Sequence, residues 1–221
     1  MQPFIETLKA EIKNEPFVDS VVCFIIFGSY VYFGKDPNDV DICVIVKNRN
    51  VDLKLLSNYI YSKFKNPDVT IYFKDELESN IPFTDIGNGV FAIEYLSYGI
   101  PLYGDNFFKD LLIKVDKSKY EESLLQKAFE YVLRLRVVYY SNKDLEYKKN
   151  YFCKYVIRLA KSILLFLGSD YSQLMKLSNE EVVRLLSNKC VIKTQEQKDI
   201  NDLTYLFNLY QDLNIFLLTL K

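Results

Sequence analysis

One uninterrupted apolar run, VVCFIIF at residues 21–27, sets the strongest limit on how this chain can fold. The run is rich in β-branched and aromatic residues and has no polar position, a pattern typical of a strand that is buried on both faces. Such a strand must be covered on either side by other elements of the chain. The run ends at Gly28.

The segments around this strand supply the expected cover. Residues 3–14 carry apolar side chains at helical spacing behind Pro3, and a later segment repeats that pattern. Two further apolar stretches, DVDICVIV and DVTIYF, predict strands. The predicted order is a helix at 3–14, strands at 21–27 and 39–46, a helix at 51–65 and a strand at 68–73. We therefore expect an α+β fold in which a small mixed sheet is flanked by helices.

The second half of the chain has a different character. Proline and glycine become frequent between residues 80 and 106, which predicts a connector with one helix at 90–97. Four segments with a 3.6-residue period then follow, at 118–141, 148–167, 178–187 and 195–219. They predict a helical bundle. The expected domains are residues 1–105 and 106–221, joined near residues 105–117.

The chain contains no histidine and no tryptophan, which removes several classes of chemistry. Ser-His and Cys-His nucleophiles, His general bases and His-ligated metal sites are all excluded. Any catalysis must rest on carboxylates, Lys, Tyr, Ser, Cys or a metal ion held by oxygen atoms.

The composition also bears on partners and location. With 28 Lys and Arg against 29 Asp and Glu, no basic field covers the whole chain, although a local basic cleft is compatible with these totals. The four cysteines form no C-x-x-C pair and are expected to be free thiols in a reducing cytoplasm. No signal sequence opens the chain, and no apolar run approaches the roughly 20 residues that span a bilayer. We expect a cytoplasmic protein that does not enter a membrane.

Two carboxylates, Asp39 and Asp41, stand at the start of the second predicted strand. Alternate residues of a strand point to the same side, so both acids are expected to share a face with Cys43. Two such groups repel each other unless a cation or a shared proton lies between them, and oxygen ligands favour Mg²⁺ or Mn²⁺. The simpler alternative is that Asp39 is a turn residue and Asp41 its partly exposed neighbour.

Gly28 and Ser29 follow the buried strand, and Ser29 stands ten residues before Asp39. A glycine at that point allows backbone N–H groups to approach a phosphate closely. The pattern apolar-Gly-Ser, nine residues, Asp-apolar-Asp-apolar resembles the signature of the DNA polymerase β-like nucleotidyltransferase superfamily, especially its minimal and aminoglycoside nucleotidyltransferase branches. The matching positions are Phe27, Gly28, Ser29, Asp39, Val40, Asp41 and Ile42.

The resemblance implies a role for each of these polar residues. Gly28 and Ser29 would bind the triphosphate, and Asp39 and Asp41 would hold two magnesium or manganese ions. A third acid on a later strand would complete the site and help to deprotonate the acceptor hydroxyl. Asp68 is the expected third acid because it opens the next predicted strand, although an ordinary strand-start aspartate is the alternative. Asp75 and Glu76 are the fallback.

Three cations in the second half of the chain are candidate nucleotide ligands. Lys154, Arg158 and Lys161 stand at positions i, i+4 and i+7 of one predicted helix. They would neutralise the β- and γ-phosphates if that stripe faced the first domain, whereas a solvated helix face is the simpler alternative. Arg134 and Arg136 invite the same suggestion with less support.

The expected function is metal-dependent transfer of a nucleoside monophosphate, with ATP as the expected donor of AMP, to a hydroxyl group with release of pyrophosphate. The acceptor is a small molecule, a partner protein or a tRNA, and the sequence does not choose among them. A homodimer is compatible with the sequence. The alternative is a non-catalytic nucleotidyltransferase-like binding or antitoxin module of a toxin–antitoxin or defence system.

Overall fold

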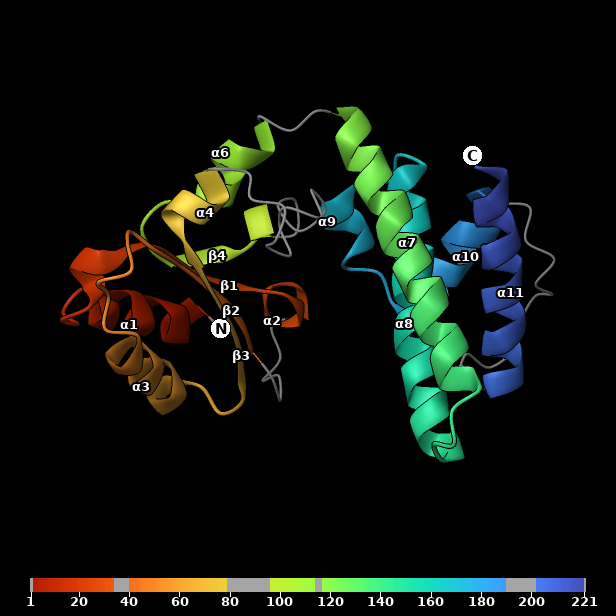
Figure 1. Cartoon of the computed structure of the whole chain (residues 1–221), viewed down its shortest axis with the longest axis horizontal. Coiled ribbons are helices and arrows are strands. Elements are labelled where there is room, and N and C mark those ends of the chain that lie inside the picture. Colours follow the sequence, from red (N-terminus) through yellow and green to blue (C-terminus); the bar gives the residue numbers. More distant parts are fainter. Residues whose placement is uncertain (1, 34–39, 79–95, 114–116, 190–201, 221) are drawn as a thin grey trace. The chain divides into compact units, whose positions relative to one another are not determined.

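The computed structural model describes residues 2–33, 40–78, 96–113, 117–189 and 202–220. The chain divides into two compact units, Met1–Lys117 and Ser118–Lys221 (Figure 1). The first unit contains the sheet, and the second is helical in its described part. The first unit extends beyond residue 105 because helix α6 (Phe107–Ile113) buries Phe108 in the core beneath the sheet.

The first unit is built on a four-stranded mixed sheet. Its strands are β1 (Val21–Phe27), β2 (Val40–Val46), β3 (Pro67–Phe73) and β4 (Ile100–Tyr103). They lie in the order β3-β2-β1-β4. Strand β1 is antiparallel to both of its neighbours, and β2 is parallel to β3. The parallel pair is joined through helix α3 (Leu53–Lys63), whose first turn is capped by Asp52 Oδ1 accepting from the Leu55 N–H at 3.0 Å.

Helices cover both faces of this sheet (Figure 1). One face packs against α3 and against helix α1 (Gln2–Ile12), which contributes Ile5, Leu8 and Ile12. The other face packs against α6 and against helix α4 (Lys74–Glu78), through Phe108 and Leu77. The prediction from VVCFIIF of a strand buried on both faces is confirmed, and with it the α+β fold class.

One strand was not expected from the sequence. The proline and glycine content of residues 80–106 predicts a connector, whereas Ile100–Tyr103 pairs with β1. Proline lacks a backbone N–H and is normally excluded from central strands, but β4 is an edge strand, where Pro101 can be accommodated. Most of the helix predicted at 90–97 lies outside the described residues.

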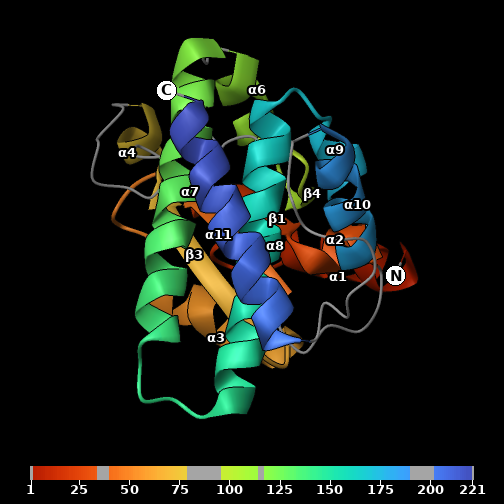
Figure 2. The same ribbon diagram turned by 90° about the vertical axis from the view of Figure 1, so that its right-hand side faces the viewer.

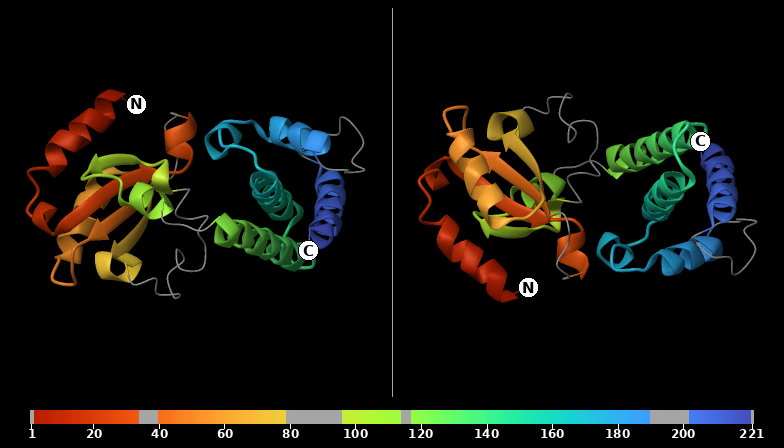
Figure 3. Two further views of the ribbon diagram at one scale, coloured as in Figure 1. Left: turned by 90° about the horizontal axis from the view of Figure 1, so that it is seen from above. Right: turned by 90° about the horizontal axis from the view of Figure 1, so that it is seen from below.

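The second unit is a bundle of helices. Its described helices are α7 (Lys117–Tyr139), α8 (Leu145–Phe166), α9 (Tyr171–Leu174), α10 (Asn179–Lys189) and α11 (Leu203–Thr219). Helix α8 packs against α10 and α11 and lies at the centre of the unit, with α7 on a further side (Figures 2 and 3). The predicted helical bundle is confirmed. Among the described helices, none has both the length and the hydrophobicity needed to cross a membrane.

Candidate active site

The candidate site lies where three strands meet at one end of the sheet. Strand β1 ends at Phe27, which pairs with Asp41 near the start of the antiparallel strand β2. Asp41 in turn pairs with Asp68 near the start of the parallel strand β3. The register therefore brings the last residue of β1 and the second residues of β2 and β3 into one row across the sheet.

Asp41 and Asp68 project from the same face of the sheet. Residues in register on neighbouring strands have their side chains on the same side, and such strands lie about 4.8 Å apart. Asp41 is half-buried and Asp68 is exposed, so this row runs from the core to the solvent. The predicted face is confirmed for Asp41, because Cys43 belongs to the core below the same face while Val40 and Ile42 belong to the opposite core.

Gly28 and Ser29 lie at the same end of the sheet, directly after β1. Gly28 adopts a φ of 75°, in the left-handed region that favours glycine. This turn allows the short helix α2 (Ser29–Phe33) to begin at once, and the Val31 N–H donates to the Gly28 carbonyl oxygen at 3.1 Å. Gly28 is buried and Ser29 is exposed, so the Ser29 side chain is accessible to a ligand.

The ligand chemistry of this end of the sheet is compatible with a hard divalent cation. Among the described residues, Asp68 forms no ion pair with a Lys or Arg side chain. Carboxylate oxygens are the ligands that Mg²⁺ and Mn²⁺ prefer. Within the described ranges, no three His, Cys, Asp or Glu side chains gather at one point. The predicted ligand Asp39 lies outside those ranges, so its role stays a prediction.

The two fallback acids, Asp75 and Glu76, do not lie at the end of the sheet that carries Asp41 and Asp68. Asp75 and Glu76 follow the last residue of β3, and Asp68 near the start of that strand is about 17 Å away along it. The Arg49 guanidinium binds both acids, at 2.6 Å from Asp75 Oδ2 and 3.3 Å from Glu76 Oε1. This ion pair is the main reason that the pKa of Asp75 lies below its usual value. These contacts favour Asp68 over Asp75 and Glu76 as the partner of Asp41.

The three predicted cations of the second unit have different environments. Lys154 and Arg158 are exposed on α8, and their charged groups lie 5.9 Å and 5.3 Å from the centre of the Tyr155 ring. Lys161 is half-buried, with its Nζ 3.9 Å from Met175 Sδ. Burial and the charge of Arg158 lower the pKa of Lys161. The expectation that these cations contact a nucleotide stays a prediction.

Asn106 is a buried residue that no pattern in the sequence singles out. Its Nδ2 donates to the carbonyl oxygens of Leu96 and Ser97, each at 3.1 Å, and of Gly99 at 3.3 Å. Its Oδ1 accepts from the Phe108 N–H at 3.1 Å. One amide therefore fixes the turn that leads into β4, which begins beside the end of β1 and so beside the candidate site.

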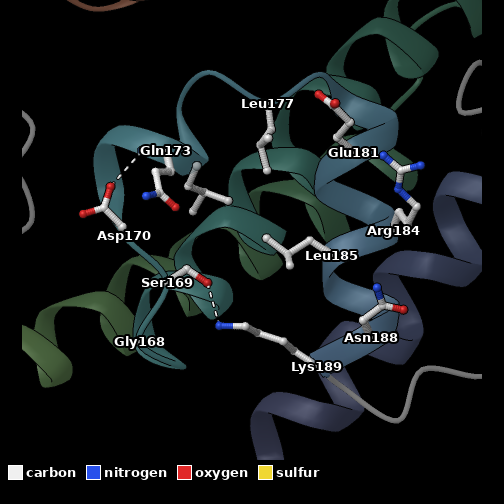
Figure 4. Close-up of a pocket in the computed structure, with 11 residues that line it drawn as sticks. Gly168, Ser169, Asp170, Gln173, Leu177, Glu181, Arg184, Leu185, Asn188 and Lys189 are labelled. Atoms are coloured by element: carbon white, nitrogen blue, oxygen red, sulfur yellow. Dashed lines mark hydrogen bonds between the residues drawn. The ribbon is translucent and has the colours of Figure 1, made fainter.

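A separate pocket of about 600 Å³ lies in the second unit (Figure 4). Three leucines line it, and its rim carries charged groups that already have structural partners. Asp170 Oδ1 accepts from the Gln173 N–H at 2.9 Å and caps α9, while Lys189 Nζ donates to Ser169 Oγ at 3.0 Å. Glu181 Oε2 accepts from the Ser178 N–H at 2.7 Å. None of the predicted site residues lines this pocket.

Comparison with known proteins leaves the family of this chain open. No protein-family model and no curated protein matches it. Among solved structures, the chain is similar to a nucleotidyltransferase-like protein from Exiguobacterium sibiricum 255-15, at 12% sequence identity. The similarity covers 99% of this chain and 75% of that protein, with a TM-score of 0.34. A likeness at this level does not establish a common fold.

Proposed function

We propose that this protein is a metal-dependent nucleotidyltransferase that transfers a nucleoside monophosphate to a hydroxyl group. The observation that carries the proposal is the register of Asp41 with Asp68, beside the Gly28-Ser29 turn. An acidic pair and an accessible Gly-Ser turn at one sheet end are what a triphosphate and its metal ions require. Asp39, two residues before Asp41 in the sequence, is the further metal ligand in this proposal.

The proposed reaction is an in-line displacement. The acceptor hydroxyl oxygen attacks the α-phosphorus, the bond from that phosphorus to the α,β-bridging oxygen breaks, and pyrophosphate leaves with the electron pair. Bound Mg²⁺ or Mn²⁺ ions neutralise the triphosphate and make the hydroxyl more acidic. Asp68, the exposed member of the pair, would ligate a metal ion and take up the hydroxyl proton, and the half-buried Asp41 would serve as a further metal ligand.

The chain also offers groups that would hold the rest of the triphosphate. The Gly28-Ser29 turn would contact the β- and γ-phosphates through the Ser29 hydroxyl and backbone N–H groups. Lys154, Arg158 and Lys161 are proposed as additional phosphate contacts. ATP is the proposed donor, and the acceptor is a small molecule, a partner protein or a tRNA.

The assay that tests this proposal supplies each labelled nucleoside triphosphate with Mg²⁺ and a panel of acceptors: tRNA, candidate partner proteins and aminoglycosides. The wild-type protein should label one acceptor and release pyrophosphate. Asp41→Asn should abolish transfer and leave the far-ultraviolet circular dichroism unchanged. Asp75→Asn is the matched control, because Asp75 lies at the other end of the sheet, and it should retain activity.

The alternative is a binding module that has the fold and lacks the reaction. Such a module would not need Mg²⁺ to bind a nonhydrolysable ATP analogue, or would not bind one at all. Appreciable transfer by Asp41→Asn would refute the assignment of this residue.

A further inference from the structure

The side of α8 that faces α7 carries a cluster of tyrosines and cations, and two of these cations, Lys154 and Arg158, are also proposed above as contacts of the triphosphate. The rings of Tyr147, Tyr151 and Tyr155 stack in sequence, with centroid separations of 5.8 Å and 4.2 Å. Tyr131 of α7 packs against Tyr155 at 5.7 Å. Arg134, also on α7, approaches the same ring, with its guanidinium carbon 5.9 Å from the centre of Tyr155.

Three cations surround a single ring in this cluster. The guanidinium carbons of Arg134 and Arg158 lie 5.9 Å and 5.3 Å from the centre of the Tyr155 ring, and Lys154 Nζ lies at 5.9 Å. Within the described part of the chain, none of the three forms an ion pair with a carboxylate. Like charges held this close repel one another, so an anion bound between them would be stabilised.

The sequence around the cluster is rich in basic residues and poor in acidic ones. From Tyr147 to Phe166, α8 contains five Lys and Arg residues and no Asp or Glu. The second half of the chain also carries more basic than acidic residues, and the first half carries the reverse. Residues 118–221 hold sixteen Lys and Arg against twelve Asp and Glu, whereas residues 1–117 hold twelve against seventeen. The local field at α8 is therefore positive although the whole chain is nearly neutral.

The positive charges around Tyr155 also influence the pKa of its phenol group. Partial burial of the phenol raises its pKa, but the charges of Arg158 and Lys154 and the nearby polar groups of Tyr151 and Arg134 more than reverse that effect. The pKa of Tyr155 is therefore lower than its ordinary value. A group of donors that favours a phenolate oxygen also favours a phosphate oxygen.

The cluster extends along helix α8 and forms a strip on its surface. From Tyr147 to Arg158 the helix rises about 16 Å, so the rings and cations are spread along the helix. Tyr147 stands at one end with 42% of its surface exposed, and Lys143 lies 5.5 Å from its ring centre. Aromatic rings combined with a line of cations are the usual surface for unpaired nucleotides.

We infer that the strip formed by Tyr147, Tyr151, Lys154, Tyr155, Arg158 and Arg134 binds a single-stranded nucleic acid. The cations and tyrosine hydroxyls hold successive backbone phosphates, and the exposed ring of Tyr147 stacks on a base. The inference concerns the second unit alone, and it gives Lys154 and Arg158 a polynucleotide as their ligand in place of the triphosphate of the proposed reaction.

Fluorescence anisotropy with a short labelled oligothymidylate and the full chain tests this inference. Binding should weaken as salt rises, and Arg134→Gln should weaken it about tenfold and make the salt slope shallower by about 0.7. Tyr147→Ala should weaken it by a similar factor through lost stacking. Arg184→Gln, an exposed arginine of α10 away from the cluster, is the matched control and should bind as the wild type does.

Four outcomes would overturn the inference. The first two are no binding at low salt and an equal loss of affinity in Arg184→Gln. The third is displacement of the oligonucleotide by MgATP, which would assign the strip to the nucleotide. The fourth is equally effective competition by polyglutamate, which would indicate a general polyanion surface. Circular dichroism identifies any variant that fails to fold, and Arg158→Gln then serves as the second variant of the strip. Asp41→Asn should bind the oligonucleotide normally, so failure of the transferase proposal and failure of this one are distinguishable.

Discussion

Asp41 on β2 lies in register with Asp68 on the parallel strand β3, and both carboxylates project from one face of the sheet. The two residues are separated by helix α3 in the chain, so only the crossover brings them together. Neighbouring carboxylates destabilise each other when both are ionised, and a divalent cation removes that cost. This relationship makes the end of the sheet the centre of the functional proposal.

The buried thiols should be inert. Burial raises the pKa of Cys23 to about 11 and raises the pKa of Cys43 further, whereas Cys153 is only half-buried. We expect iodoacetamide at pH 8 to modify Cys153 well before Cys23 or Cys43, as followed by peptide mass spectrometry. Denatured protein, in which all thiols react, is the control. Alkylation of Cys43 as fast as Cys153 in the native protein would contradict this expectation.

Cys23 should also make folding sensitive to alkaline pH. Its pKa is higher in the folded state than the value of about 8.5 for a free thiol, so its contribution to stability is fully present below that value. The contribution is lost as pH rises toward 11. Urea midpoints measured at pH 8 and pH 10 should differ, and Cys23→Ala should show a smaller difference. An unchanged difference would show that other groups cause the alkaline loss.

Removal of the Tyr59 hydroxyl group should stabilise the folded protein. Its hydroxyl oxygen is buried and has no hydrogen-bond partner among the described residues, and burial with the charges of Glu11 and Glu15 raises its pKa to about 12. Tyr59→Phe keeps the ring contact with Phe17 and should raise the free energy of unfolding by about 1 kcal/mol. Tyr61→Phe, on the exposed side of the same helix, should have no effect. A loss of stability in Tyr59→Phe would mean that the hydroxyl has a partner in solution.

Asn106 should contribute more to the free energy of unfolding than an exposed asparagine does. Asn106→Ala removes the donor shared by three buried carbonyl oxygens and should lower the free energy of unfolding by about 2 kcal/mol in urea titrations. Asn14→Ala, which loses one exposed hydrogen bond to the Ala10 carbonyl oxygen, should cost far less. Equal effects of the two substitutions would refute the role assigned to Asn106.

Much of the first unit was predictable because its patterns are local. The apolar runs gave β1, β2 and β3, and the alternation along β2 placed Asp41 on the same face as Cys43. The choice of Asp68 rested on its position at the start of a strand, and the pairing with Asp41 is a matter of sheet register. Register depends on packing between strands, which no single segment encodes.

The features that the sequence did not predict depend on contacts between distant segments. Strand β4 was missed because Pro101 is acceptable only at an edge of the sheet, and the edge is known once the strands are ordered. The cluster around Tyr155 needs Arg134 from α7, a helix whose packing against α8 cannot be derived from helical periodicity. The periodicity did place Lys154 and Arg158 together, whereas Lys161 turns toward Met175.

The most direct measurement of the central claim is calorimetric titration of the protein with a nonhydrolysable ATP analogue, with and without Mn²⁺. The account predicts binding that requires the metal, that weakens about tenfold or more in Asp41→Asn and in Asp68→Asn, and that is unchanged in Asp75→Asn. Binding that is equally strong without Mn²⁺, or undiminished in Asp41→Asn, would contradict it.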